Sequence, residues 1–314
     1  MPYTSTIVVT GGTSGLGYAT AMNLSQSHPD SQIVITGRTL PPGALDNAPN
    51  TNIVFLRVDL STHASTRAFA AEYHARGFPP ISSIILNAGV QVIDGIQYSP
   101  DDIELMFATN HVNHSLLFYL LASELQPDAS VVIVSSSTHD PKFGRAPEMK
   151  YVSAEEAAYK PYGSEKNTFA EALARYALSK LANLLFAYAL HDYARQNAKG
   201  WIVMTLDPGV IPTRLYRHTG GIVGAVANWA LGSFIGRFFI GDLFTAEFVA
   251  STVAEMATGE TFSGIDKSGK YYGAKGAQEI ESSEKSHDKA AQRDLWDWTL
   301  KTVMTGDERK QWAL

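Results

Sequence analysis

The sequence predicts a single α/β domain, doubly wound, in which helices flank both faces of a parallel sheet. Two observations predict this fold class. Short β-branched runs alternate with segments long enough for crossover helices, and a glycine-rich turn follows the first run. Functional residues in such a sheet gather at the carboxyl ends of its strands. We therefore treat residues 1–314 as one domain and look for the site at that edge.

The first expected strand is Ile7-Val8-Val9, and a helix follows it, since Ala19, Ala21, Met22 and Leu24 recur at helical spacing. Between them lies the turn Thr10-Gly11-Gly12-Thr13-Ser14-Gly15-Leu16-Gly17. Glycines let the backbone approach a pyrophosphate, and the helix N-terminus supplies partial positive charge. Strand, turn and helix together predict the phosphate-binding end of a Rossmann-type fold.

Five further strands are expected in chain order: Gln32–Thr36, Ile53–Val58, Ile84–Leu86, Val131–Val134 and Ile202–Leu206. Two regions exceed the minimal fold, and a further segment ends the chain. Residues 138–174 form a polar insertion before the helix that carries Tyr176, and residues 280–314 form a C-terminal helical segment. Residues 215–245 are apolar and punctuated by glycines, which favours a substrate lid. Polar residues keep the apolar runs of that segment below the roughly 18 residues of a membrane span, so a helix touching a membrane surface is the alternative.

Composition excludes several classes of function. There are 25 basic and 31 acidic residues and no basic run, so we expect no nucleic-acid partner. The absence of cysteine excludes disulfides, thiolate metal sites and a thiol nucleophile. The first strand begins by Ile7 with no basic region before it, so we expect no signal peptide and a cytoplasmic protein. Monomer and homodimer both remain open.

Tyr176 and Lys180 lie four positions apart, so a helix places both side chains on one face. An ammonium beside a phenol favours the phenolate and lowers the tyrosine pKa from about 10. Such a tyrosine exchanges a proton with a carbonyl or alcohol near neutral pH. The pair alone is common on helix surfaces, but its place downstream of the glycine turn favours a catalytic role.

Polar residues follow several expected strands: Asp59, Asn87-Ala88-Gly89, the serines 135–137, and Asp207-Pro208-Gly209-Val210-Ile211-Pro212-Thr213. Each alone fits an ordinary turn, and Asp59 equally fits a helix N-cap. Their order along the chain, together with Tyr176 and Lys180, favours one shared site. His111 and His114 do not indicate a metal site, because no carboxylate or third histidine stands at ligand spacing nearby.

These motifs resemble those of the short-chain dehydrogenase/reductase family, whose fingerprint is Thr-Gly-x-x-x-Gly-x-Gly. The resemblance runs from Thr4 to about Ala257 and is greatest to the subgroup of retinol dehydrogenases and light-dependent protochlorophyllide reductases. It implies four catalytic residues, Asn110, Ser136, Tyr176 and Lys180, with Asn113 and Ser137 as the competing candidates for the first two. It also implies a cofactor site made of Gly11, Thr13, Ser14, Gly15, Leu16, Gly17, Arg38, Asp59, Leu60, Asn87, Ala88, Gly89, Tyr176, Lys180, Pro208, Gly209, Val210 and Thr213.

The resemblance implies a role for each catalytic residue. Ser136 polarises the substrate oxygen, Tyr176 exchanges its proton, and Lys180 lowers the tyrosine pKa and binds the cofactor ribose. Asn110 holds a water near the lysine. Asp59 contacts the adenine, Asn87 steadies the sheet, and Thr213 contacts the nicotinamide carboxamide.

Gly37 and Arg38 decide the expected cofactor. Enzymes that hold NAD place an acidic residue at this strand end for the ribose 2′-hydroxyl, whereas here glycine stands there and a guanidinium follows. That guanidinium suits a 2′-phosphate, so we expect NADP(H) and reduction of a carbonyl on a hydrophobic small molecule. Two alternatives stay open: a redox-neutral isomerase or dehydratase using the same pocket, and an inactive NADP-binding regulatory protein.

Overall fold

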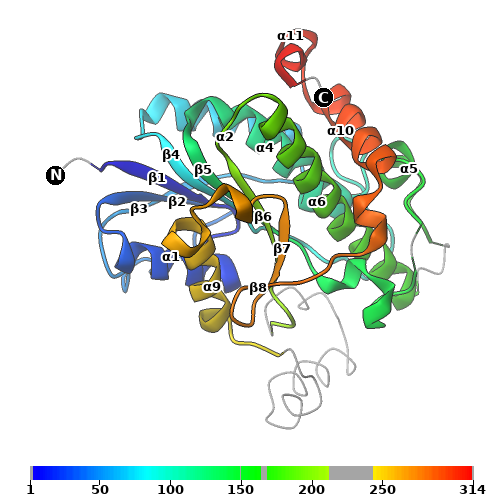
Figure 1. Cartoon of the computed structure of the whole chain (residues 1–314), viewed down its shortest axis with the longest axis horizontal. Helices are drawn as coiled ribbons and strands as arrows, with labels where there is room; N and C mark the ends of the chain where they lie inside the picture. Colours follow the sequence, from blue (N-terminus) through cyan, green and yellow to red (C-terminus); the bar gives the residue numbers. More distant parts are fainter. Residues whose placement is uncertain (1–2, 149, 164–167, 212–242, 313–314) are drawn as a thin grey trace.

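A mostly parallel sheet forms the centre of the computed structural model, which describes residues 3–148, 150–163, 168–211 and 243–312 (Figure 1). The strand order is β3-β2-β1-β4-β5-β6-β7-β8, and every neighbouring pair is parallel except β7 with β8. The strands are β1 (Ser5–Val9), β2 (Ser31–Gly37), β3 (Ile53–Arg57), β4 (Ile81–Leu86), β5 (Leu125–Val134), β6 (Ile202–Asp207), β7 (Lys270–Gly273) and β8 (Gln278–Glu279). The order reverses between β1 and β4, and ligands of doubly wound sheets bind at such a point.

Helices cover both faces of the sheet because successive strand residues point to opposite sides. On one face α1 (Gly15–Ser27) and α9 (Ala246–Thr258) bury Leu24 and Val253 in a cluster with Ile7 and Ile33. On the other face α2 (His63–Arg76), α4 (Asn113–Leu121) and α6 (Phe169–Gln196) pack over Val8, Val34 and Val131. The expected doubly wound Rossmann-type fold is confirmed.

All six strands expected from the sequence are present. The two additional strands, β7 and β8, extend the sheet beyond β6. The sequence did not indicate them, because β7 is four residues with the pattern Lys-Tyr-Tyr-Gly and β8 is only two.

The segment that we expected as an insertion, residues 138–174, is partly helical. It contains α5 (Ala154–Tyr159), and α6 already begins at Phe169, where Thr168 and Glu171 form a capping box. The carboxylate of Asp294 fixes α5 to the C-terminal helix, because it accepts hydrogen bonds from the Tyr151 hydroxyl at 2.7 Å and the Ala154 amide at 2.8 Å.

The C-terminal segment packs on α2, α4 and α6. It consists of α10 (Lys289–Val303), α11 (Gly306–Arg309) and a short turn at Lys310–Trp312. Trp296 and Trp312 are buried in an aromatic cluster with Phe118, Tyr119, Phe186 and Tyr193. Two short helical elements precede α4: α3 (Leu105–Phe107) and a π-helical turn at Ala108–Val112 that leads into α4.

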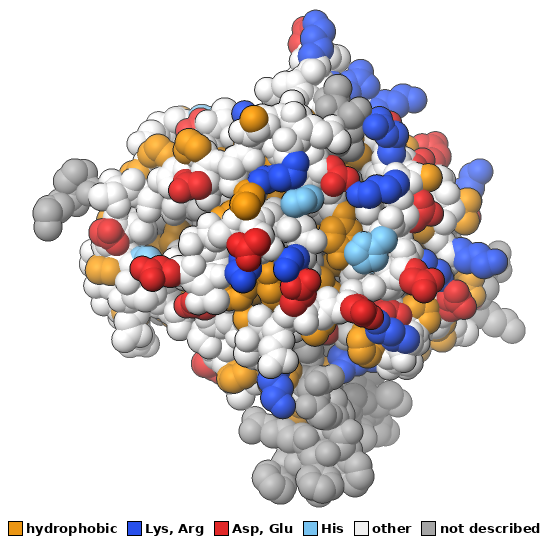
Figure 2. All heavy atoms as spheres, viewed as in Figure 1, with side chains coloured by type: hydrophobic (Ala, Val, Ile, Leu, Met, Phe, Trp, Pro, Cys, Tyr) orange, Lys and Arg blue, Asp and Glu red, His pale blue; other side chains and the backbone are white. Residues whose placement is uncertain are grey.

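Most of the proposed lid, residues 215–245, lies outside the described residues. The described chain on either side of the gap is joined, since Val210 and Leu243 pair in a parallel bridge and the Phe244 amide donates to the Val210 carbonyl. Among the helices that the structure describes, none is both long and apolar enough to cross a membrane. On the face shown in Figure 2, acidic and basic side chains are interspersed over most of the surface rather than separated by sign.

Candidate active site

The glycine turn between β1 and α1 has the geometry of a phosphate cradle. Gly11 and Gly15 have φ of +68° and +56°, a region that L side chains rarely adopt. A Cβ at Gly17 would lie 2.5 Å from both the side-chain nitrogen of Asn87 and the carbonyl oxygen of Gly11. Ser14, the N-cap of α1, makes no side-chain capping bond, and the first turn holds no acidic residue. The first amides of α1 are therefore open to an anion, which fits a dinucleotide pyrophosphate.

Thr10 and Asn87 hold the ends of β1 and β4 together at the point where the strand order reverses. The hydroxyl of Thr10 accepts from the amides of Asn87 at 2.8 Å and Ala88 at 3.0 Å. The Asn87 side chain donates to the Thr10 carbonyl at 2.8 Å. These contacts join Asn87 to the end of β1 at the floor of the cradle.

The end of β5 is fastened to α6 around Lys180. The ammonium of Lys180 donates to the Val134 carbonyl at 3.0 Å, and the Ser135 hydroxyl donates to the Lys180 carbonyl at 2.8 Å. The same ammonium lies 5.7 Å from the centre of the Tyr176 ring. These contacts bring Ser136, which follows directly, to the edge where Tyr176 and Lys180 lie.

Lys180 is only 3% exposed, and this burial lowers its pKa to about 8, an effect that the charge of Asp207 partly opposes. Burial in low dielectric disfavours an ammonium, so the group can gain or lose a proton close to neutral pH. A lysine with this property beside a tyrosine is typical of proton-transfer sites. The Tyr176 ring itself packs against the apolar side chains of Val92 and Met106.

The structure distinguishes Ser136 from Ser137. Ser136 is partly exposed and its hydroxyl oxygen accepts from the Thr138 amide at 3.3 Å, so the hydroxyl hydrogen can be donated to a ligand. Ser137 is buried, and its oxygen accepts from the guanidinium of Arg145 at 2.8 Å. The ring of His139 donates to the Ser136 carbonyl at 2.6 Å and accepts from the Ser283 amide at 3.1 Å. This geometry favours Ser136, as expected from the sequence, and adds His139 as a support that the sequence did not indicate.

Asn110 and Asn113 are also distinguished. Asn110 lies in the π-helical turn and is fully buried; its carboxamide accepts from the Val90 amide at 2.7 Å and donates to the Val90 carbonyl and the Ser179 hydroxyl, each at 3.0 Å. A Cβ on Gly89 would meet the Asn110 oxygen at 3.4 Å and the Lys180 nitrogen at 3.7 Å, so both residues lie beside Gly89. Asn113 instead contacts His63 and Thr66 of α2.

Three basic or acidic side chains lie near the ends of β2 and β3. A Cβ at Gly37 would lie 2.7 Å from the Thr13 hydroxyl, so no acidic side chain fits there without displacing Thr13. Arg38 is exposed, and Arg57, which the sequence did not single out, donates to its carbonyl at 3.2 Å. The register between β2 and β3 places Arg57 opposite Gly37, so the strand pairing would have indicated that Arg57 lies at this edge. Asp59 accepts from the Ser61 amide at 3.0 Å.

The helix-cap interpretation of Asp59 is wrong, because the N-cap of α2 is Thr62. The side chain of Leu60 is buried in the core, which leaves its backbone as the part able to meet a cofactor.

At the end of β6, Asp207 accepts from the Gly209 amide at 3.1 Å, and Gly209 has a φ of +66°. Pro208 and Val210 line the same turn, whereas Thr213 lies outside the described residues.

His111 and His114 point to different partners, the Thr299 hydroxyl and the Thr10 hydroxyl. In the described part of the chain, no group of three His, Cys, Asp or Glu side chains could hold a metal ion.

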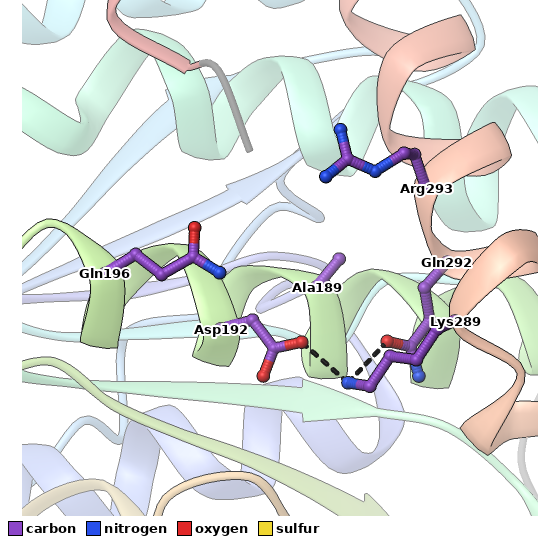
Figure 3. Close-up of a pocket in the computed structure, with 6 residues that line it drawn as sticks. All are labelled: Ala189, Asp192, Gln196, Lys289, Gln292 and Arg293. Carbon is purple, nitrogen blue, oxygen red and sulfur yellow. Dashed lines mark hydrogen bonds and ion pairs between the residues drawn. The ribbon is translucent and has the colours of Figure 1, made fainter.

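A separate cavity of about 210 Å³ lies between α6 and α10 (Figure 3). Its polar lining is largely self-paired, since the Lys289 ammonium contacts the Asp192 carboxylate at 2.6 Å and the Gln292 carbonyl at 3.0 Å. Asp192 follows Tyr176 by 16 residues on one helix, which corresponds to about 24 Å along its axis. This cavity is therefore not part of the candidate active site.

Comparison with known proteins agrees with this geometry. A family model described as short chain dehydrogenase matches residues 5–157. The short-chain dehydrogenase TIC 32 B, chloroplastic, of Brassica napus is 28% identical over 311 residues, covering 95% of this chain and 88% of the relative. A polyprenol dehydrogenase of Danio rerio is 29% identical over 301 residues, covering 92% and 83%. A solved structure of an uncharacterized protein from Mycobacterium paratuberculosis superposes with a TM-score of 0.68 at 22% identity, covering 96% and 95%.

Proposed function

Because this chain belongs to the short-chain dehydrogenase/reductase family of nicotinamide-dependent oxidoreductases, we propose that it uses NADPH to reduce the carbonyl of a hydrophobic small molecule. The observation that carries the proposal is the buried Lys180 beside Tyr176, held by β5 at the edge of the sheet next to Ser136. The uncapped N-terminus of α1 and its glycine turn supply a cradle for the dinucleotide.

Each catalytic role follows from the donors in the site. When bound, the nicotinamide supplies the hydride to the carbonyl carbon. Ser136 donates its hydroxyl hydrogen to the substrate oxygen, and Tyr176 gives that oxygen its proton as negative charge develops there. The ammonium of Lys180 stabilises the phenolate that remains on Tyr176. The Asn110 carboxamide hydrogen-bonds to the backbone of Val90 beside Tyr176 and Lys180. We propose in addition that Asn110 holds a water near Lys180.

The preference for NADPH over NADH is supported at the ends of β2 and β3. Thr13 occupies the place that an acidic side chain at position 37 would need. Two guanidinium groups, from Arg38 and Arg57, lie at this edge, and arginine is suited to bind a phosphate through paired donors.

A hydrophobic substrate is supported by the surroundings of Tyr176 and by a relative. Val92 and Met106 form an apolar wall against the Tyr176 ring. The relative from Danio rerio is named a polyprenol dehydrogenase, so it acts on a long apolar alcohol. We therefore propose an apolar aldehyde or ketone as the substrate class, enclosed by the lid predicted at residues 215–245. A cytoplasmic location stays a prediction from the sequence.

The test is NADPH oxidation with polyprenal and other apolar aldehydes and ketones, with product analysis, on wild type and Tyr176→Phe. The substitution removes one hydroxyl and almost no volume, so we expect unchanged NADPH affinity and turnover lower by about a hundredfold or more. Product formed without NADPH consumption would instead support the isomerase or dehydratase alternative. NADPH binding without any turnover across the panel would favour the regulatory protein.

A further inference from the structure

His114 joins the glycine turn to the π-helical turn through two buried hydrogen bonds. Its Nδ1 lies 3.1 Å from the carbonyl oxygen of Asn110, and its Nε2 lies 2.9 Å from the hydroxyl oxygen of Thr10. Thr10 and Asn110 are fully buried and His114 is 4% exposed. The contact with Thr10 spans 104 positions of sequence, so it links two elements that local structure alone would not connect.

The partners of His114 fix its tautomer. A carbonyl oxygen only accepts, so Nδ1 carries the hydrogen and Nε2 is the acceptor for the Thr10 hydroxyl. Burial is the main cause that lowers the pKa of His114, to about 4, and the charge of Lys180 acts in the same direction. The ring is therefore neutral at physiological pH and keeps this arrangement.

The orientation of the Thr10 hydroxyl depends on that acceptor. Its oxygen accepts from the amides of Asn87 and Ala88, while its hydrogen is directed to His114 at 2.9 Å. The carbonyl of Ile85 is a second acceptor for the same hydrogen, at the longer distance of 3.3 Å. On its other side, the ring holds the backbone of Asn110, whose carboxamide fixes Val90 near Tyr176.

We propose that His114 is a positioning residue that couples the cofactor turn to the Asn110 turn. It acts through Thr10 on the floor of the dinucleotide cradle, and through Asn110 on the chain beside Tyr176 and Lys180. The inference rests on the proposed reductase function, and its test includes a measurement that does not require that function.

Two substitutions separate the two contacts. The carboxamide of glutamine reaches the place of Nε2, whereas that of asparagine reaches the place of Nδ1. In His114→Gln, Thr10 keeps an acceptor, so the NADPH Kd should stay within about twofold of wild type while turnover of polyprenal falls. In His114→Asn, Asn110 keeps its donor, but Thr10 loses its closer acceptor and retains only the Ile85 carbonyl at 3.3 Å. The NADPH Kd should then rise roughly fivefold, with kcat at saturating NADPH retained.

His111→Gln is the matched control. His111 is also buried, lies in the π-helical turn three residues before His114, and bonds to Thr299 of α10, away from the cradle. This variant should leave the NADPH Kd unchanged even where it lowers thermal stability. In addition, combining His114→Asn with Thr10→Val should weaken NADPH binding no more than Thr10→Val alone, because both remove the same hydrogen bond.

Hydrogen exchange of the Asn87 and Ala88 amides gives a readout on the protein without cofactor. Exchange should be faster in His114→Asn and unchanged in His114→Gln. The positioning role would be overturned if both His114 variants kept the amide exchange rates and the NADPH Kd of wild type. It would also be overturned if these values rose equally in the two variants. A wild-type protein that binds no NADPH would defeat the proposed function, while the exchange difference would still decide the role of His114.

Discussion

At the scale of single residues, Asp207 sets the charge that acts on the buried ammonium of Lys180. Burial lowers the pKa of Lys180 to about 8, and the Asp207 carboxylate raises it. Asp207→Asn keeps the acceptor for the Gly209 amide but removes the negative charge. The Lys180 pKa should therefore fall below that of wild type, and the ammonium should be lost at a lower pH. We expect the alkaline limb of the kcat profile to move toward lower pH, measured from pH 6 to pH 10. An unmoved limb would mean that Lys180 does not control it.

Arg38 and Arg57 carry a second prediction at this scale, on cofactor preference. Wild type should bind NADPH at least about tenfold more tightly than NADH, equal to ~1.4 kcal/mol. Arg38→Ala should remove most of this difference, and Arg57→Ala part of it, with NADH affinity nearly unchanged in both. Arg76, which is paired with Glu72 on α2, provides the control substitution Arg76→Ala, with no expected effect. Equal affinities of wild type for the two cofactors, measured by titration, would contradict the assignment.

Sequence reasoning singles out candidate site residues more readily than the residues that contact and support them. The glycine turn, Ser136, Tyr176 and Lys180 belong to short local motifs with fixed spacing, so the sequence alone singles them out. Arg57, His114 and His139 contact partners 19, 104 and 144 positions away, and no local sequence pattern encodes such contacts. The same limit explains the missed strands: β7 and β8 lack a β-branched run and exist because β6 leaves an edge for them.

At the scale of elements, Asp294 of α10 fastens the segment that contains α5. Its carboxylate accepts both the Tyr151 hydroxyl and the Ala154 amide. In Asp294→Ala both bonds are lost, so hydrogen exchange of residues 151–159 should accelerate by roughly tenfold while the central strands stay protected. Tyr151→Phe removes one bond only and should give an intermediate increase. NADPH affinity should not change, since α5 lies outside the dinucleotide cradle. Unchanged exchange in Asp294→Ala would mean that other contacts hold α5.

At the scale of the whole molecule, an ion pair between Arg67 of α2 and Glu308 of α11 closes the C-terminal segment onto the sheet domain. The guanidinium contacts both carboxylate oxygens at 2.9 Å and donates to the Val303 carbonyl at 2.6 Å. The hydrogen bond from Arg67 is the main cause that lowers the pKa of Glu308, to about 2. Both side chains are about a third exposed, so solvent screening limits the energy of the pair.

The sign of the pH effect follows from that shift. The Glu308 pKa is lower in the folded protein than its ordinary 4.5, so its contribution is complete above about pH 4.5 and is lost as pH falls toward 2. Glu308→Gln should lower the unfolding free energy by about 1 kcal/mol at pH 7. The deficit relative to wild type should shrink between pH 4.5 and 2, because wild type loses the same interaction there.

Lys310→Ala removes an ion pair whose two side chains are 79% and 92% exposed, and should change stability by under about 0.5 kcal/mol. Denaturant titrations at several pH values provide the measurement. A Glu308→Gln deficit that stayed constant down to pH 2 would show that the charge of Glu308 is not what holds α11 against α2.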